Sequence, residues 1–149
     1  MKNDQYWMAR ALELAKHAQQ QGEVPVGAVI VRDGIVLGEG WNQPISQHDS
    51  TAHAEIQALR AACTHVENYR LPGATLYVTL EPCIMCAGAI VHARIERVVY
   101  AAKEPKTGAV GSCFDIFNTQ QLNHHVHCEH GLLADESTQL LQDFFRSRR

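Results

Sequence analysis

Four residues of this chain have types and spacings that could bind a metal ion and move a proton. Cys83 and Cys86 stand three positions apart, and His53 and Glu55 stand two apart further upstream. Two thiolates and one imidazole are typical zinc ligands, and a set of three leaves the fourth coordination position free for water. The remaining carboxylate, Glu55, is suited to proton transfer. These residue types predict a hydrolytic zinc site.

The elements expected around these residues explain how they could meet. A helix is expected over residues 83–93, and another is expected to begin near Ala52. At 3.6 residues per turn, Glu55 lies about 200° around the second helix from His53. Both can approach one ion only if it lies off the N-terminal end of that helix. We therefore expect two helix N-termini to converge on the metal, where their partial positive charge would stabilise the thiolates.

Two other interpretations of the cysteine pair remain open from the residues alone. A redox-active Cys-x-x-Cys motif would leave His53 and Glu55 unexplained. A structural zinc site would need a fourth Cys or His at regular spacing, and no second Cys-x-x-Cys motif is present. We expect Cys63 and Cys113 to be small core residues. The histidine-rich tract 124–130 is expected to be a solvated sheet edge, since alternate residues of a strand face opposite ways, with a second metal site as the alternative.

The hydrophobic pattern predicts one domain over residues 1–149 with an α/β fold. A helix over 4–21 is followed by two strands, 24–31 and 35–40, which an Asp-Gly turn joins into a hairpin. After the helix near Ala52, the expected elements are a strand over 74–80, the helix over 83–93, a strand over 97–102, a loop over 103–112, a short strand over 126–129 and a terminal helix. Alternating helices and strands indicate helices on both faces of a mixed sheet.

Composition limits the classes of partner. The net charge of −3 gives no overall electrostatic signal for nucleic acid, so any RNA contact must be local. Apolar runs are too short to span a membrane, and the N-terminus lacks the apolar segment of a signal peptide. The five cysteines form an odd set, which favours reduced thiols in the cytoplasm.

With its His-x-Glu and Pro-Cys-x-x-Cys motifs, the sequence resembles the zinc-dependent nucleoside and nucleobase deaminases. Within them it is most similar to the TadA-type tRNA-specific adenosine deaminases. The segments that carry this resemblance extend over nearly the whole chain: 23–29, 38–42, 48–49, 51–56, 68–71, 76–83, 85–89, 106–108 and 143–146.

The resemblance implies a three-layer α/β/α, cytidine-deaminase-like fold with a mixed sheet of roughly five strands. It also implies one Zn²⁺ per subunit, a homodimer whose interface helps to build the substrate pocket, and a tRNA anticodon stem-loop as partner. The reaction would be hydrolytic deamination of the wobble adenosine to inosine, with a zinc-activated water and Glu55 as proton shuttle. The alternatives are a deaminase of guanine, cytosine or free nucleosides, and a non-catalytic zinc-stabilised RNA-binding module.

The resemblance assigns roles to further residues by their positions. His53, Cys83 and Cys86 would be the metal ligands, and Asn42 would hydrogen-bond the flipped base. The remaining substrate contacts would come from Glu104, Lys106, Phe145, Arg146, Arg148 and Arg149. Glu104 stands where an aspartate is expected in many relatives.

Overall fold

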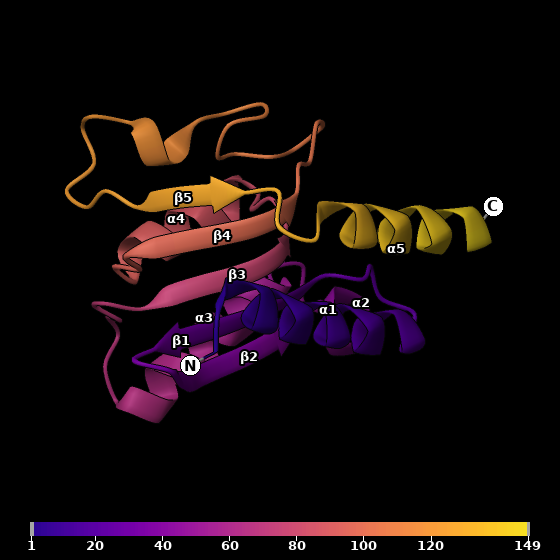
Figure 1. Ribbon diagram of the computed structural model, residues 1–149, viewed down its shortest axis with the longest axis horizontal. Helices are drawn as coiled ribbons and strands as arrows, with labels where there is room; N and C mark the ends of the chain where they lie inside the picture. The colour runs from indigo at the N-terminus through magenta and orange to yellow at the C-terminus, as the bar shows by residue number, and fades with distance from the viewer. Residues whose placement is uncertain (1, 149) are drawn as a thin grey trace.

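The computed structural model describes residues 2–148, which fold around a five-stranded sheet with the order β2-β1-β3-β4-β5. The strands are β1 (Gly27–Arg32), β2 (Ile35–Trp41), β3 (Thr75–Leu80), β4 (Arg97–Ala102) and β5 (His127–His130). β1 is antiparallel to both β2 and β3, whereas β3, β4 and β5 run parallel (Figure 1). The expected mixed sheet is confirmed.

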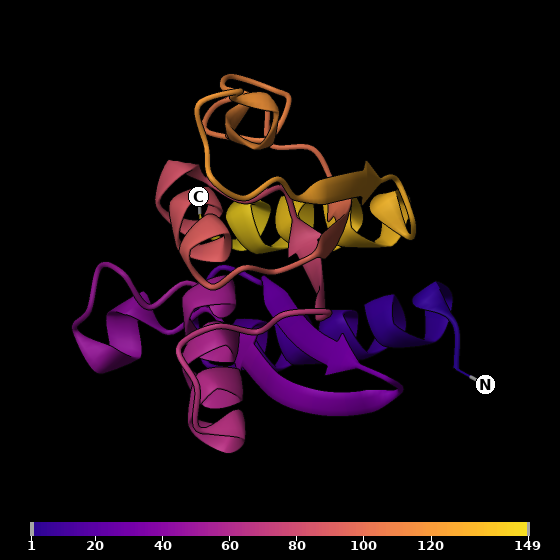
Figure 2. The ribbon, with the colours of Figure 1, turned by 90° about the vertical axis from the view of Figure 1, so that its left-hand side faces the viewer.

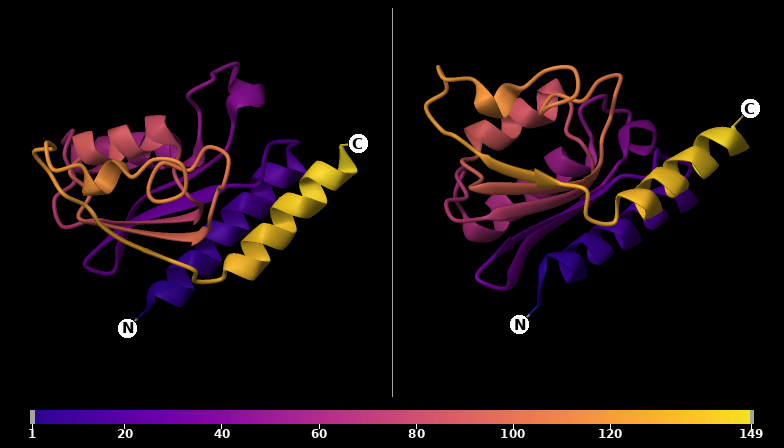
Figure 3. Two further views of the ribbon diagram at one scale, coloured as in Figure 1. Left: turned by 90° about the horizontal axis from the view of Figure 1, so that it is seen from above. Right: turned by 45° about the horizontal axis from the view of Figure 1, so that its top comes forward.

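Helices cover both faces of this sheet, as expected. α3 (Ala54–Val66) and α4 (Ile84–His92) lie on one face, and α1 (Asp4–Gln20) and α5 (Ala134–Ser147) lie side by side on the other (Figures 2 and 3). Alternate strand residues enter the two cores: Leu76 and Val78 pack toward α3 and α4, whereas Tyr77 packs toward α1. The result is a three-layer α/β/α arrangement.

Local signals account for the first three elements. Asn3 caps α1 by accepting a 3.0 Å hydrogen bond from the Tyr6 N–H, and the helix stops just before Gly22. Asp33 and Gly34 both have positive φ, as a type I′ hairpin turn requires. The first strand begins at Gly27 instead of residue 24, because Pro25 has no N–H to donate to a ladder.

Two glycines of β2 allow α3 to approach the sheet closely. A Cβ atom at Gly38 would lie 2.5 Å from the Ala58 carbonyl oxygen, and one at Gly40 would lie 2.5 Å from the Ala58 nitrogen. A larger residue at either position would push α3 away from the sheet. This contact matters for function because it fixes the helix that carries Glu55.

The structure corrects several details of the sequence interpretation. The segment between β2 and α3 contains the short helix α2 (Pro44–Gln47), and the region before β5 contains a 3₁₀ turn, η1 (Ile116–Asn118); neither is among the expected elements. Cys113 is exposed and not a core residue; its thiol donates to the Pro105 carbonyl oxygen.

An ion-pair network joins the first helix to the parallel side of the sheet. The Arg97 guanidinium on β4 donates to both carboxylate oxygens of Asp4 at 2.9 and 2.6 Å, and it also pairs with Glu129 on β5. The Tyr77 hydroxyl donates to Asp4 at 2.6 Å. These contacts fasten the start of α1 to β3, β4 and the edge strand.

None of the helices in residues 2–148 is long and apolar enough to cross a membrane.

Candidate metal centre and substrate groove

The structure brings His53, Cys83 and Cys86 together in one cluster. Their ligand atoms all lie within 4.8 Å of one another, and both sulfur atoms lie 3.6 Å from Nδ1 of His53. Cys86 is buried, whereas His53 and Cys83 are half-buried. His53 is 30 positions from Cys83 and 33 from Cys86 along the chain. The three residues meet because two helices begin at the same place.

Each of those helices begins at a cluster residue. His53 is the N-cap of α3 and Cys83 is the N-cap of α4, both with extended backbone, and neither side chain caps its own helix. Their side chains are therefore available to each other. The N-terminal partial charges of both helices point at the cluster and favour thiolate and carboxylate groups there.

The separations fit the donor geometry of zinc. A tetrahedral ion with a Zn–S distance of about 2.3 Å and a Zn–N distance of about 2.05 Å places sulfur and nitrogen ligands about 3.6 Å apart. Both Sγ–Nδ1 separations match this value. Two thiols and one imidazole nitrogen are also ligands that zinc prefers. The residues present therefore fit a zinc ion with three protein ligands.

Glu55 lies in the first turn of α3 beside the cluster, with only 4% of its surface exposed. Burial raises the pKa of Glu55 to about 7. Hydrogen bonding from Cys86 lowers the pKa of Cys83 to about 4, and the same contact raises the pKa of Cys86. The cluster thus combines a thiolate with a buried carboxyl group.

Asn42 holds the start of α3 in place. Its Oδ1 atom accepts a 2.8 Å hydrogen bond from the backbone N–H of Ala54, the residue between His53 and Glu55. The Asn42 N–H in turn donates to the Val26 carbonyl oxygen at 3.1 Å. Asn42 therefore ties the end of β2 to the helix that carries the cluster histidine.

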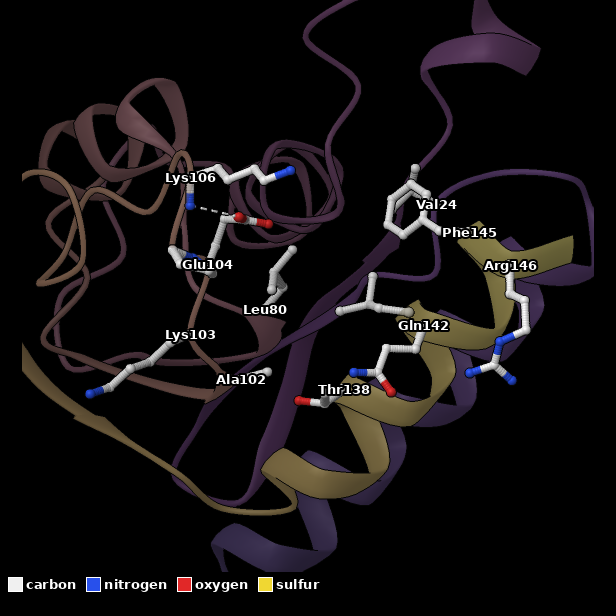
Figure 4. A pocket seen from close by; sticks show the side chains of 12 residues that line it. Val24, Leu80, Ala102, Lys103, Glu104, Lys106, Thr138, Gln142, Phe145 and Arg146 are labelled. Carbon is white, nitrogen blue, oxygen red and sulfur yellow. Dashed lines mark hydrogen bonds between the residues drawn. The ribbon is translucent and has the colours of Figure 1, made fainter. Parts of the chain in front are cut away.

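A groove of about 830 Å³ lies near the carboxyl ends of β3 and β4, the edge of the sheet from which the chain leads to Cys83. Leu80 and Ala102 line it where these strands end. Four residues expected to bind substrate line this groove: Glu104, Lys106, Phe145 and Arg146. Figure 4 shows the loop residues on one side and the α5 residues on the other.

The other expected substrate residues are placed differently. Arg148 donates to the Gly22 carbonyl oxygen, and its guanidinium carbon lies 4.6 Å from the centre of the Phe144 ring. It therefore joins α5 to the end of α1 and does not line the groove. Asn42 follows β2 and contacts the first residue of α3, and Arg149 falls outside the described residues.

Sequence reasoning missed two buried carboxylates that shape the loops around the site. Glu23 is 1% exposed and accepts hydrogen bonds from the backbone N–H groups of Ile45 and Ser46, at 3.2 and 2.8 Å. It thereby holds α2 in the connection that leads to His53. Glu81 is 3% exposed and accepts four hydrogen bonds from the loop after β4. The available signal was an acidic residue beside proline and strand residues, where the chain was expected to be buried.

The histidine-rich tract forms an exposed sheet edge, as expected. β5 pairs only with β4 in the described sheet, and His127 and His130 are exposed. Among residues 2–148, His53, Cys83 and Cys86 are the one group of three or more potential ligands close enough to share an ion.

Comparisons with known proteins agree with this geometry. A model of the cytidine and deoxycytidylate deaminase zinc-binding region matches residues 1–102. A tRNA-specific adenosine deaminase from Haemophilus influenzae is 54% identical over 98% of this chain and 85% of its own length.

Two solved structures are also similar. One, from a study of A-to-I editing by tRNA:A34 deaminases at the wobble position of transfer RNA, has a TM-score of 0.88 and 46% identity, covering 91% of this chain and 99% of that chain. A guanine deaminase from Bacillus subtilis has a TM-score of 0.68 and 34% identity, covering 99% of this chain and 94% of that chain.

Proposed function

This chain belongs to the zinc-binding cytidine and deoxycytidylate deaminase family, and we propose that it hydrolyses the wobble adenosine of a tRNA anticodon loop to inosine and ammonia. One observation carries the proposal: a three-ligand cluster of His53, Cys83 and Cys86 stands beside the buried carboxylate of Glu55. A fourth protein ligand would make such a site structural, whereas three leave a position for a reacting water.

The three cluster residues would hold the zinc ion. When bound there, zinc acts as a Lewis acid that lowers the pKa of a water ligand to about 7. Glu55 accepts a proton from the attacking water and delivers it to the adjacent ring nitrogen of the base, which makes C6 electrophilic. The same carboxylate then takes the proton of the new C6 hydroxyl group and passes it to the departing amine, so that C6 becomes a carbonyl and ammonia leaves. Water and adenosine are thus converted into inosine and ammonia, with every proton transferred at the Glu55 carboxylate.

The groove supports an RNA substrate over a free base. Lys103, Lys106 and Arg146 line it together with the half-exposed ring of Phe145. Basic side chains contact phosphates, and an aromatic ring can stack on an unpaired base. A loop nucleotide is already partly unstacked, so turning it into the site costs less than extracting a base from a duplex. We assign no RNA contact to Arg148, because it is engaged by Gly22 and Phe144.

Guanine is the second candidate substrate, since the Bacillus subtilis guanine deaminase aligns with nearly the whole chain. The Haemophilus influenzae tRNA-specific adenosine deaminase is more similar in sequence, and a basic groove of this size is not needed for a free base. Incubating the protein with an anticodon stem-loop RNA, free adenosine and guanine separates the two candidates. We expect inosine from the RNA; ammonia from guanine alone would favour the second.

We further propose that the enzyme is a cytoplasmic homodimer. Its substrate, transfer RNA, is matured and used in that compartment. Ile84, next to Cys83, and Phe114 in the loop before η1 are each more than half exposed. Exposed large apolar side chains, one of them adjacent in sequence to a metal ligand, are suited to cover by a second copy. Light scattering on the purified protein should give twice the mass of one chain.

A further inference from the structure

The loop over residues 103–112 forms one wall of the groove and is fastened to the segment that leads into the metal cluster. Glu104, Pro105 and Lys106 line the groove. At the base of the loop, the Glu81 N–H donates to the Ala102 carbonyl oxygen at 2.8 Å, and the Ala109 N–H donates to the Pro82 carbonyl oxygen at 2.9 Å. Both anchor points immediately precede Cys83.

The Glu81 carboxylate is the centre of this attachment. Its Oε1 accepts a hydrogen bond from the Glu104 N–H at 3.1 Å, and its Oε2 accepts from the Val110 and Ser112 N–H groups, each at 3.1 Å. The Ser112 hydroxyl donates to Oε1 as well. Donors from the beginning and the end of the loop therefore converge on one side chain.

The loop also closes tightly over this carboxylate. A Cβ atom at Gly108 would lie 2.5 Å from Oε2 of Glu81 and 2.5 Å from the Glu104 carbonyl oxygen. Only a glycine leaves room for the carboxylate at that point. The Glu81 side chain therefore lies within the curve of the 103–112 loop and helps to fix the path of the backbone around Lys106.

Stability of the fold alone does not explain this arrangement. Burying a charged carboxylate is unfavourable unless its oxygens are hydrogen-bonded, and a carbonyl or apolar side chain would avoid that cost. Within residues 2–148, Glu81 forms no ion pair at 4.0 Å or less. Both of its oxygens accept hydrogen bonds from donors in the 103–112 loop. The charged carboxylate therefore holds that loop in position.

We propose that Glu81 is a positioning residue, which sets the groove wall at Glu104–Lys106 relative to the metal ligand Cys83 and so places the anticodon loop. This inference rests on the proposed function. Glu81 does not line the groove, and it belongs to none of the ligand pairs of the cluster. It acts on substrate only through the 103–112 loop.

The Glu81→Gln variant tests this role. Glutamine keeps one oxygen and replaces the other with an amide donor, so either the Glu104 N–H or both the Val110 and Ser112 N–H groups lose their acceptor. We expect amide hydrogen exchange to accelerate about tenfold on the side that loses its acceptor, either at Glu104 or at both Val110 and Ser112. The KM for an anticodon stem-loop should rise about five- to tenfold, with kcat within about twofold and zinc content unchanged.

Two further variants act on the same contact from the loop side. Ser112→Ala removes one of the four donors and should raise KM by a smaller factor. Because its partner is already altered, the same substitution should add little in the Glu81→Gln background. Gly108→Ala presses on the carboxylate directly and should reproduce the KM effect of Glu81→Gln. These variants also carry the test if Glu81→Gln does not fold.

Glu129→Gln is the matched control. This substitution removes the charge of a carboxylate on β5 that pairs with Arg97 at the start of β4, and neither residue belongs to the 103–112 loop. It should lower thermal stability without changing KM. A KM increase in Glu129→Gln equal to that in Glu81→Gln would overturn the proposal, as would unchanged KM and amide exchange in folded Glu81→Gln. If wild-type protein makes no inosine, the proposed function fails, and amide exchange still decides whether Glu81 positions the loop.

Discussion

The Oδ1 atom of Asn42 accepts a 2.8 Å hydrogen bond from the backbone N–H of Ala54. This contact fixes the orientation of the Asn42 amide, because an N–H group must face the oxygen and not the NH₂ group. What the side chain presents to a ligand is therefore its Nδ2 donor. Asn42 thus holds the start of α3, and we propose that its Nδ2 group also donates a hydrogen bond to the flipped base, as the resemblance implies.

Asn42→Asp separates these two roles. The aspartate retains an acceptor for the Ala54 N–H but replaces the donor toward the base with an oxygen. We expect thermal stability and zinc content close to wild type, and kcat/KM on the stem-loop reduced about tenfold or more. Asn42→Ala, which loses both contacts, should be destabilised as well. Unaltered kinetics in Asn42→Asp would remove Asn42 from the substrate site.

The metal content of the purified protein tests the cluster. We expect one zinc per chain in wild type and loss of that zinc in Cys83→Ser, since a hydroxyl is a much poorer zinc ligand than a thiolate. Cys113→Ser is the matched control, because Cys113 is exposed and contacts Pro105 instead of the cluster. Elemental analysis after gel filtration measures both. Equal zinc in the two variants would show that the ligand set is misassigned.

The Asp4–Arg97 ion pair makes stability depend on pH. Hydrogen bonds from Arg97, opposed by burial and aided by Tyr77, lower the pKa of Asp4 from its model-compound value of 3.8 to about 2. A lowered pKa stabilises the fold above the unfolded-state pKa, and that contribution is lost as pH falls from about 4 through about 2.

Asp4→Asn should therefore be less stable than wild type near pH 7, by about 1 kcal/mol or less because both side chains are partly exposed. The difference should shrink as the pH approaches 2. Urea unfolding at several pH values measures it. A stability difference that stays constant from pH 7 to pH 2 would contradict the assignment of the ionised pair.

Two arginines at the C-terminal end of α5, Arg146 in the helix and Arg148 at its C-cap, have different expected roles in RNA binding and in stability. Arg146→Ala should weaken stem-loop binding and reduce its dependence on salt, since Arg146 lines the groove and its guanidinium can neutralise a phosphate. Arg148→Ala should instead lower thermal stability, because it loses the contacts with Gly22 and Phe144. Fluorescence anisotropy over a salt series and thermal melts report the two effects. Equal loss of RNA binding in the two variants would contradict the assignment of an RNA contact to Arg146 and not to Arg148.

Much of the fold was predictable because its signals are local. Asn3, the Asp33-Gly34 turn and the alternation along β3 each act within a few residues, and the offset between His53 and Glu55 already required a metal beyond a helix end. The helix α2 was missed because four residues show no periodicity, and Glu23 holds it from more than twenty positions away.

The parts that could not be predicted depend on long-range contacts. The hydrogen-bond partners of a buried carboxylate such as Glu81 could not be predicted from the sequence, because its donors lie 23 to 31 residues away. From the sequence, Arg148 is expected to be a solvated residue at a helix end. Its actual partner, the Gly22 carbonyl oxygen, lies 126 positions away along the chain. Cys113 seemed suited to the core by residue type, yet it lies on an exposed loop.

The most direct test measures inosine at the wobble position of an anticodon stem-loop RNA, made by zinc-loaded wild type and zinc-loaded Glu55→Gln. The two proteins differ only in that an NH₂ group replaces one oxygen of the buried carboxyl group, so zinc content should be equal. We expect wild type to form inosine with one ammonia per base converted, and Glu55→Gln to be slower by about 100-fold or more. Comparable turnover by the two proteins, or no inosine from wild type, would contradict deamination through Glu55.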